Sequence, residues 1–463
     1  MSFEPKTLDC FKAYDIRGRI GAEIDEGVCR RIGRALAEQL SARQVVIGFD
    51  ARETSPAFAA ALSLGVREAG SDVLDLGLAG TEEMYWAVNH FGACAGATVT
   101  ASHNPIDYNG IKIVGPGARP LDPAGDFQRL KLLAERGDWR REGQLGADQD
   151  VSGEARRAYV ERVLGFVDLE RLAPLKILLN SGNGAAGPTL DALTGRLSEL
   201  GVKADFVRMH HAPDAGFPNG IPNPLLPENQ APTTNAVREA GADFGVAFDG
   251  DFDRCFLFDG GGAFVSGEYV VALLARASLA REPGAAIVHD PRVTWGTREA
   301  VAALGGTAVA APTGHAFLKA KMRETGAAYG GEMSAHHYFR DFAYCDSGMI
   351  PWLLVWQQIS QTGKSLRELV AGDRRRFPSS GEMNFTVKDP GACLRAAEET
   401  YAPGALAVDT LDGLSLEFAD WRFNLRKSNT EPLVRLNVEA RGSAELVREK
   451  ARELSAFIEG APA

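Results

Sequence analysis

Cysteine is scarce, and its spacing excludes two classes of protein. The 463 residues contain six Cys, and no two of them form a C-x-x-C pair. A cysteine-rich zinc domain and a small disulfide-bonded secreted domain are therefore excluded, and a reducing compartment is indicated. The sequence also lacks any apolar run of roughly 18 residues, so no transmembrane helix is predicted.

Positive charge is in the minority. Lys and Arg number 50 against 61 Asp and Glu, which gives a formal net charge of -11. Proteins that coat nucleic acid or anionic membranes need net positive surface, so neither partner is expected. A small anionic substrate needs only a local positive pocket. The N-terminal residues lack the apolar core of a signal peptide, so we expect a cytoplasmic protein, acting as a monomer.

Low-complexity tracts are absent, and an internal repeat organises most of the chain instead. The length suggests about three domains. Three segments each contain a continuous apolar run, a helix-like stretch and two further short apolar runs, which predicts strands buried on both faces. The successive runs are residues 45–50, 72–76 and 97–100, then 176–180, 204–207 and 244–248, then 286–290, 307–310 and 327–329. The sequence therefore predicts three α/β units in a row.

The boundaries of these units are less regular. The first helix is predicted to have its cap at Thr54, a proline near its first position and its end at Gly70. From about Pro378 onward, the pattern changes to that of a smaller α+β domain. Its predicted strands are residues 383–387, 414–418 and 433–440, and its closing helix is 443–458. Linkers are predicted near residues 143–153, 259–262 and 372–380.

Polar stretches, each predicted to be a loop, follow the third apolar run of each repeat. They are residues 100–112, 249–254 and 331–337. Because ligands of parallel sheets bind beyond the carboxyl ends of the strands, these stretches predict one site that is shared among domains.

The first polar stretch contains a candidate phosphoryl carrier. Ser102 directly follows a predicted strand, and His103 and Lys112 are the nearby groups that would activate its hydroxyl. The alternative is an ordinary turn, in which serine and asparagine side chains cap the backbone.

The second stretch contains a candidate metal site. Asp249, Asp251 and Asp253 alternate along the chain, so their carboxylates can converge on a hard divalent cation. An EF-hand is excluded, because Arg254 and Gly260 stand where that loop needs glycine and glutamate. A short cage with open positions favours Mg²⁺ bound next to a phosphate. The alternative is a solvated acidic turn.

Two further loops carry polar groups of a recognisable kind. Glu332 and Ser334 are natural hydrogen-bond partners for sugar hydroxyls. Residues 426–432, RKSNTEP, combine cations, hydroxyls and an amide that can bind a phosphate, with a capped surface turn as the alternative. A G-x-G-x-x-G match at residues 182–187 is interpreted as a tight strand-to-helix turn and not as a dinucleotide site, because it stands alone.

In combination, these motifs resemble those of the α-D-phosphohexomutase superfamily, and specifically its bacterial phosphomannomutase/phosphoglucomutase branch. The resemblance covers the whole chain. It is carried by AYDIRG at residues 13–18, TASHNP at 100–105, DGDFDR at 249–254, GEMS at 331–334 and SNTEP at 428–432.

The resemblance implies an α/β fold with three repeated α/β domains that contain mixed sheets, and a smaller C-terminal α+β domain, around a central cleft. The implied domains are a phosphoserine domain at residues 1–148, a metal-binding domain at 149–258, a sugar-binding domain at 259–371 and a phosphate-binding domain at 372–463. A hinge near Gly372 would let the last domain close on the substrate.

The implied reaction is reversible transfer of phosphate between the 1- and 6-positions of a glucose or mannose phosphate. Phospho-Ser102 would be the carrier and hexose 1,6-bisphosphate the intermediate, with glucose 1,6-bisphosphate as activator. Mg²⁺ would be held by Asp249, Asp251, Asp253 and an oxygen on Ser102. The groups implied at the reaction centre are Tyr14, Arg17, His103, Lys112 and Arg254. The groups implied to bind the sugar and its second phosphate are Arg292, Gly314, His315, Glu332, Ser334, His336, Arg426, Ser428, Asn429 and Thr430.

Several positions depart from the family pattern. Phe252 stands where a small residue is common, Arg292 where this branch often has lysine, and the sugar loop adds Ala335 and His337. These departures leave the preferred sugar open, with phosphoglucosamine as the rival substrate. Two other functions compete, namely a sugar phosphatase with Asp249 or Asp251 as nucleophile and a non-catalytic sugar-phosphate sensor.

Overall fold

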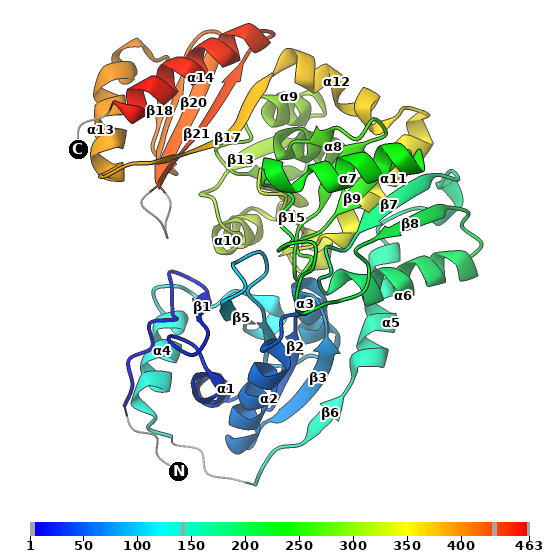
Figure 1. Ribbon diagram of the computed structural model, residues 1–463, viewed down its shortest axis with the longest axis vertical. Coiled ribbons are helices and arrows are strands. Elements are labelled where there is room, and N and C mark those ends of the chain that lie inside the picture. Colours follow the sequence, from blue (N-terminus) through cyan, green and yellow to red (C-terminus); the bar gives the residue numbers. More distant parts are fainter. Residues whose placement is uncertain (1–4, 140–143, 428–432, 461–463) are drawn as a thin grey trace. The chain divides into compact units, whose positions relative to one another are not determined.

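The computed structural model describes residues 5–139, 144–427 and 433–460, and Figure 1 gives its elements. The chain forms two compact units. Unit 1 consists of Met1–Phe264 and His336–Gly363, and unit 2 of Val265–Ala335 and Lys364–Ala463.

Unit 1 begins with a six-stranded sheet in the order β1-β5-β4-β2-β3-β6. Its strands are β1 Ile16–Arg19, β2 Gln44–Phe49, β3 Asp72–Leu78, β4 Ala95–Val99, β5 Tyr108–Val114 and β6 Asp148–Asp150. Its helices are α1 Glu26–Gln39, α2 Ser55–Glu68, α3 Thr81–His90 and α4 Asp126–Arg136, with a short 3-10 turn, η1, at Pro116–Ala118.

The second part of unit 1 repeats this plan around the strand order β10-β9-β7-β8. Its strands are β7 Lys176–Asn180, β8 Asp205–Met209, β9 Phe244–Ala247 and β10 Phe256–Asp259, and β11 Phe264–Val265 lies where the chain passes into unit 2. Its helices are α5 Ser152–Leu164, α6 Ala186–Glu199 and α7 Ala231–Ala240, with η2 at Leu169–Arg171 and η3 at Pro227–Asn229. The later segment of unit 1 adds β15 His337–Phe339, η4 Arg340–Phe342, β16 Cys345–Asp346 and α11 Met349–Thr362.

Unit 2 contains the third α/β repeat and the C-terminal domain. The repeat is made of α8 Gly267–Arg281, β12 Ala286–His289, α9 Trp295–Ala303, β13 Thr307–Ala310, α10 His315–Thr325, β14 Tyr329–Gly331 and α12 Leu366–Arg376. The C-terminal domain is made of β17 Ser379–Thr386, α13 Pro390–Tyr401, η5 Ala402–Gly404, β18 Ala407–Asp409, β19 Leu414–Glu417, β20 Trp421–Lys427, β21 Leu433–Ala440 and α14 Ala444–Glu459.

The predicted repeat is confirmed by the strand pairing. In each repeat the first strand pairs in parallel with both the second and the third, as β2 does with β3 and β4, β7 with β8 and β9, and β12 with β13 and β14. The third strands β4 and β9 then pair antiparallel with β5 and β10, so these sheets are mixed. The four central residues of β2 are buried, which explains its continuous apolar run.

The C-terminal domain is an antiparallel sheet in the order β17-β21-β20-β19-β18. Figure 1 shows α13 and α14 alongside it, and buried residues of both helices join the core formed by the sheet. The smaller α+β domain that the sequence predicts is therefore confirmed.

Two details of the sequence prediction are wrong. Tyr108 to Lys112 belong to strand β5, and Arg426 and Lys427 end strand β20, so none of these residues lies in a loop. Gly372 lies inside α12, so a flexible linker does not begin there. Thr54 occupies the predicted cap position of α2, although its side chain makes no capping bond and its hydroxyl instead accepts a hydrogen bond from Asn109.

Helices α1 and α2 cross where each presents a glycine. A Cβ on Gly33 would overlap the carbonyl of Leu62, and a Cβ on Gly65 would overlap the carbonyl of Arg30. We expect Gly65→Ala to lower the free energy of unfolding by about 3 kcal/mol, because backbone cannot yield as a flexible side chain does. The control is Gly195→Ala in α6, where nothing lies within 4 Å of the added methyl group and alanine favours the helix by about 1 kcal/mol. Equal stability of both variants in urea unfolding would contradict this close crossing.

A fully buried carboxylate joins α3 to the start of α11. Glu82 on α3 accepts N–H bonds from Gly348, at 2.9 Å, and from Met349, at 3.1 Å. Desolvation outweighs these bonds and raises the pKa of Glu82 from 4.5 to about 8. The folded protein therefore holds a proton at neutral pH that the unfolded chain releases.

Glu82 is accordingly expected to make stability depend on pH. Between about pH 5 and 8 the unfolded chain binds fewer protons at this group, so the free energy of unfolding falls by about 1.4 kcal/mol for each pH unit. Glu82→Gln keeps the shape and removes the titration. The difference in unfolding free energy between variant and wild type should grow in the variant's favour from pH 5 to 8, whereas parallel pH curves would refute this origin.

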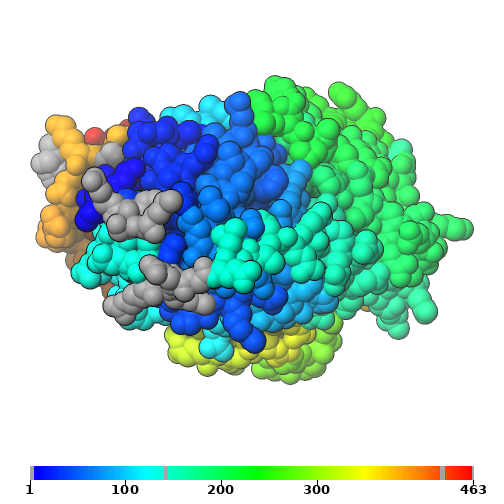
Figure 2. Space-filling model, turned by 90° about the horizontal axis from the view of Figure 1, so that it is seen from below, coloured from blue at the N-terminus to red at the C-terminus, as the bar shows by residue number. Residues whose placement is uncertain are grey.

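Among residues 5–139, 144–427 and 433–460, no helix is both long enough and apolar enough to span a bilayer. Figure 2 shows the blue, cyan and blue-green residues of unit 1 as one continuous surface. All six cysteines are free thiols, and only Cys94 is not buried.

Candidate active site

Ser102 lies in a tight turn at the end of β4. Its backbone is left-handed, with φ 47°, and its side chain is buried. The Ser102 N–H donates to Thr100 Oγ1 at 2.8 Å, and the Ser102 hydroxyl donates to Asp249 Oδ2 at 2.6 Å. His103 Nδ1 lies 3.0 Å from the same hydroxyl. A conformation that is unusual for serine is thus stabilised by bonds from three sides.

Arg52, a residue that sequence reasoning missed, stabilises the turn by hydrogen bonds to its backbone carbonyls. Arg52 donates to the carbonyls of Ser102, Asn104, Pro105 and Tyr108, at 2.8, 2.5, 2.9 and 3.1 Å. Arg52 and its ion-pair partner Asp50 follow directly after β2. They could have been predicted from the rule that sites form at the carboxyl ends of strands.

The three aspartates of the metal loop converge, as their spacing predicts. Asp249, Asp251 and Asp253 are at most 2% exposed, and they offer carboxylate oxygens that lie within 4.8 Å of one another. Asp249 Oδ2 accepts a hydrogen bond from the Ser102 hydroxyl. The Oδ2 atoms of Asp251, at 2.8 Å, and of Asp253 both accept from Lys112 Nζ. Within the described residues, the buried Oδ1 atom of each aspartate has no hydrogen-bond partner. Three such oxygens are the ligands that a hard divalent cation needs.

Glycine lets the carrier turn and the metal loop approach each other. A Cβ on Gly250 would lie 2.6 Å from the carbonyl oxygen of Ser102, closer than real contacts allow. Gly184 in turn packs on Gly250, whose carbonyl accepts the Ala185 N–H at 3.0 Å. The glycines of the G-x-G-x-x-G segment therefore serve the tight turn that the sequence predicts, and they also seat the metal loop.

The charges of this centre influence each other strongly. Desolvation and then the carboxylates of Asp253 and Asp251 raise the pKa of Asp249 to about 7. Desolvation acts the same way on Asp253, but Lys112 and Arg254 outweigh it and hold its pKa well below the usual value. Burial lowers the pKa of Lys112, yet Asp251 and Asp253 more than reverse this, so its pKa is raised and the side chain stays cationic.

Further cations surround the carrier turn. Arg17 on β1 donates to the carbonyl of Thr100 at 2.7 Å, and Arg254 Nε lies 3.5 Å from Asp249 Oδ2. The His103 side chain is 30% exposed, yet desolvation by the surrounding atoms and the charges of Arg254, Arg17 and Lys112 lower its pKa well below 6.5. His103 is therefore neutral, and the centre combines three permanent cations with three carboxylates.

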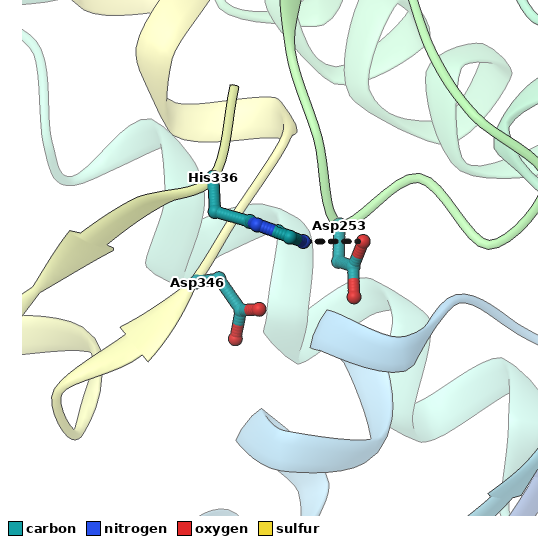
Figure 3. Close-up of side chains that lie close together, drawn as sticks. All are labelled: Asp253, His336 and Asp346. Carbon is teal, nitrogen blue, oxygen red and sulfur yellow. Dashed lines mark ion pairs between the residues drawn. The ribbon is translucent and has the colours of Figure 1, made fainter. Parts of the chain in front are cut away.

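His336 joins the centre from the later segment of unit 1. Figure 3 shows its imidazole pointing toward Asp253, with Asp346 of β16 beside them. His336 Nε2 lies 3.6 Å from Asp253 Oδ1 and accepts a hydrogen bond from Arg254 Nε at 3.1 Å. Asp346 is a buried carboxylate that sequence reasoning missed, because a single aspartate in a two-residue strand gave no signal.

Most of the reaction-centre residues predicted from the sequence thus meet within unit 1. Ser102, His103, Lys112, Arg17, Arg254 and the three aspartates form one connected group. Tyr14 is half-buried in the turn that precedes β1.

Apart from His336, which belongs to unit 1, the predicted sugar-binding residues that the structure describes lie in unit 2. Glu332, 1% exposed, follows β14, and its Oε1 accepts the N–H of Gly314 at 2.8 Å. Gly314 has φ 126°, a conformation that favours glycine, and it places His315 at the first position of α10. Ser334 lies two residues beyond Glu332 in the same turn.

The predicted phosphate-binding arginines gather around a carboxylate that sequence reasoning missed. Glu382 on β17 accepts from Arg292 and Arg426 at 3.0 Å each and from Arg435 at 3.3 Å. Burial alone would raise the pKa of Glu382, but these arginines lower it to about 2. The buried Nε atoms of Arg426 and Arg435 have no hydrogen-bond partner among the described residues.

Arg292 is also bound by Asp290, with NH2 2.5 Å from Oδ2. Ser428, Asn429 and Thr430 lie outside the described residues. Asp290 and Glu382 therefore hold the arginines of unit 2 in place. The Nε donors of Arg426 and Arg435 can bind an anion.

Comparison with known families covers almost the whole chain. Four domain families match: "Phosphoglucomutase/phosphomannomutase, alpha/beta/alpha domain I" at residues 9–134, domain II at 157–262, domain III at 266–377 and the C-terminal domain at 382–456. A phosphomannomutase from Salmonella typhimurium is 54% identical over 453 residues, which are 97% of this chain and 99% of that protein. A protein named phosphohexose mutases, from Xanthomonas campestris, is 50% identical over 98% of this chain and all of its own length.

Solved structures show the same fold. A phosphoglucomutase/phosphomannomutase family protein from Burkholderia thailandensis superposes with a TM-score of 0.85 at 33% identity, over 98% of both chains. N-acetylphosphoglucosamine mutase from Aspergillus fumigatus, in complex with GlcNAc-6P and magnesium, has a TM-score of 0.58 at 15% identity, over 99% of this chain and 96% of its own. A variant of that enzyme in complex with glucose 1,6-bisphosphate has a TM-score of 0.60 at 14% identity, over 100% and 97%. At such identities the likeness of the last two concerns the fold alone.

Proposed function

Because the chain belongs to the phosphoglucomutase/phosphomannomutase family and is a hexose phosphate mutase, we propose that Ser102 carries the phosphoryl group that it transfers. The observation that carries this assignment is the Ser102 hydroxyl, presented by a left-handed turn 2.6 Å from Asp249, within a group of cations and carboxylates.

The proposed phosphoryl transfer takes place in two steps. A free hydroxyl of the hexose phosphate attacks phospho-Ser102, so that one P–O bond forms on the sugar, the P–Oγ bond breaks and the hydroxyl proton is released. The resulting hexose 1,6-bisphosphate turns end for end, and Ser102 takes back its other phosphate while the sugar oxygen takes up a proton. Glucose 1,6-bisphosphate supplied from outside would reload an unphosphorylated Ser102 by the same second step.

We propose that Asp249, Asp251 and Asp253 hold Mg²⁺. Their buried Oδ1 atoms have no hydrogen-bond partner in the described part of the chain, and carboxylate oxygens are the ligands that Mg²⁺ prefers. Bound there beside Ser102, the ion supplies charge neutralisation for the transferring phosphoryl oxygens. Lys112, Arg17 and Arg254 are proposed to add positive charge at the same place, because phosphoryl transfer depends mainly on positioning and charge. Tyr14, His103 and His336 are proposed to contact the reacting end of the substrate.

The residues of unit 2 are proposed to bind the remainder of the substrate. Glu332 and Ser334 would hold sugar hydroxyls, with Gly314 and His315 beside them, since Glu332 already receives the Gly314 N–H. Arg292 and Arg426 would bind the phosphate that is not transferred, together with Ser428, Asn429 and Thr430, which remain a prediction from the sequence. All of these residues come from one chain, so a monomer is the smallest form that carries the proposed site.

Turnover of several sugars tests this proposal. The purified protein, supplied with Mg²⁺ and a trace of glucose 1,6-bisphosphate, is expected to convert glucose 1-phosphate and mannose 1-phosphate to their 6-phosphates without net release of inorganic phosphate. Faster conversion of glucosamine phosphate than of either would assign the chain to that rival substrate. Stoichiometric release of inorganic phosphate without isomer would instead support a phosphatase, and no reaction with any sugar would support a sensor.

A further inference from the structure

The start of helix α3 contacts the metal loop, residues 249–254, which carries the three aspartates. Thr81, the first residue of α3, is fully buried and lies 170 positions before Asp251. Its hydroxyl donates to Asp251 Oδ2 at 2.6 Å, and its backbone N–H donates to the Asp251 carbonyl oxygen at 3.1 Å. One residue of the first domain thus binds both the side chain and the backbone of a single aspartate in the second.

This contact leaves one oxygen of Asp251 for a cation. Oδ2 already accepts from Thr81 and, at 2.8 Å, from Lys112, while the buried Oδ1 has no hydrogen-bond partner within the described part of the chain. Two donors on one oxygen fix the rotation of the carboxylate. The second oxygen is therefore directed by the protein before any ion arrives.

The neighbouring contact is steric. A Cβ on Gly80, the cap residue of α3, would overlap the ring of Phe252 in the metal loop. Phe252 is fully buried and has a left-handed backbone, with φ 46°. The aromatic ring therefore packs against this bare glycine and holds the loop against the helix.

The start of α3 is itself fixed. The Gly80 N–H donates to Glu83 Oε2 at 2.9 Å. The other oxygen of Glu83 accepts from Arg156 on α5 at 3.0 Å and from Thr189 on α6 at 3.1 Å. The hydroxyl of Thr81 is thus carried by a helix end that the second domain braces.

We propose that Thr81 is a positioning residue for the cation site, whose hydroxyl occupies Asp251 Oδ2 so that Oδ1 is aimed at Mg²⁺. The inference rests on the proposed assignment of Mg²⁺ to the three aspartates. Residues that orient a metal ligand in this way typically change metal affinity by about 10- to 100-fold when they are removed. Thr81 does not touch substrate or ion, so its effect is on affinity for Mg²⁺ and not on the chemical step.

Thr81→Val keeps the shape and removes the hydroxyl, and Thr81→Ser keeps the hydroxyl. Titration of the full-length, unphosphorylated protein with MgCl₂ in a calorimeter is expected to give a Kd about 10- to 100-fold weaker for Thr81→Val than for wild type, with Thr81→Ser close to wild type. The Mg²⁺ concentration for half-maximal isomerisation should shift by the same factor, while kcat at saturating Mg²⁺ recovers. A purely structural role would lower kcat at every Mg²⁺ concentration and leave the Kd unchanged, which would overturn the proposal.

A matched control and a second variant complete the test. Thr297 on α9 is also fully buried, and its hydroxyl has no hydrogen-bond partner among the described residues, so Thr297→Val should leave the Mg²⁺ Kd unchanged. If Thr81→Val does not fold, Thr81→Cys takes its place, and its weaker donor is expected to give a smaller shift in the same direction. Asp251→Asn distinguishes an error in the metal site from an error in the role of Thr81. If Asp251→Asn binds Mg²⁺ as wild type does, the metal site itself is wrong, whereas if only Thr81→Val and Thr81→Cys bind normally, the role of Thr81 is wrong.

Discussion

Ser102→Ala is expected to lower kcat/KM for glucose 1-phosphate isomerisation by at least about 10⁴-fold, a size typical of the loss of a covalent carrier. The substitution removes one oxygen from a buried side chain and leaves the turn's backbone bonds from Arg52 in place. The protein is therefore expected to fold normally and to bind sugar phosphates. The measurement is a coupled assay for the 6-phosphate, together with the intact mass of the protein after incubation with glucose 1,6-bisphosphate.

A second buried serine supplies the control. Ser71 donates its hydroxyl to the carbonyl of Ala42 at 2.7 Å, so Ser71→Ala removes a buried hydrogen bond of similar kind from the same domain. Ser71→Ala should lose stability and keep its activity, and it should still gain the mass of one phosphoryl group. If Ser102→Ala keeps wild-type turnover, or gains that mass, Ser102 is not the carrier.

Asp249→Asn is expected to separate activity from stability. Activity should fall by about 10³-fold or more, because the substitution removes a charged oxygen beside both Ser102 and the proposed ion. Stability in EDTA at pH 8 should change in the opposite direction. The folded pKa of Asp249 is about 7 against an ordinary 3.8, so its charge opposes folding progressively as the pH rises from about 4 to 7, by a few kcal/mol in total.

Mg²⁺ is expected to reverse this order of stability. An ion that binds only the folded wild type raises its melting temperature as the Mg²⁺ concentration increases, and the variant lacks much of that gain. Thermal melts at pH 8 in EDTA and in excess MgCl₂ test the crossover. The control is Asp259→Asn: Asp259 is equally buried and accepts N–H bonds from Gly261 and Ala263 in its own turn. This control should lose the same stability with and without Mg²⁺, and identical behaviour of Asp249→Asn would refute the metal assignment.

The parts of the fold that the sequence predicts correctly are those with a local cause. Residues 176–180 and 307–310 are strands with the predicted bounds, because a short apolar run between turn residues leaves few alternatives. Lys112 was misplaced in a loop for the same reason, since its strand carries an asparagine, a glycine and a lysine that weaken the apolar pattern. Thr54 occupies the predicted cap position of α2, but the hydrogen bond of its hydroxyl with Asn109, 55 positions away in the chain, has no local signal in the sequence.

The candidate site shows the same division. The three aspartates were recognisable because alternate carboxylates on one loop repel each other unless a cation compensates them. Arg52, Thr81 and Glu382 were not, because an arginine, a threonine or a glutamate has no distinctive neighbours in the sequence. Each acquires its role from a partner that is distant along the chain, as Glu382 does from Arg292, which lies 90 positions earlier.

Composition and local pattern thus determined which chemistry this chain carries, namely an acidic protein with three α/β repeats, a serine turn and a carboxylate cage. Local pattern acts through neighbours, and neighbours suffice for strands, turns and the choice of donor atoms. Only the tertiary structure decided how those donors are used. Ser102 meets Asp249 across 147 positions, and Thr81 meets Asp251 across 170. Which oxygen of a carboxylate is occupied and which is left for an ion depends on such distant contacts, because each buried polar atom must find its partner in space.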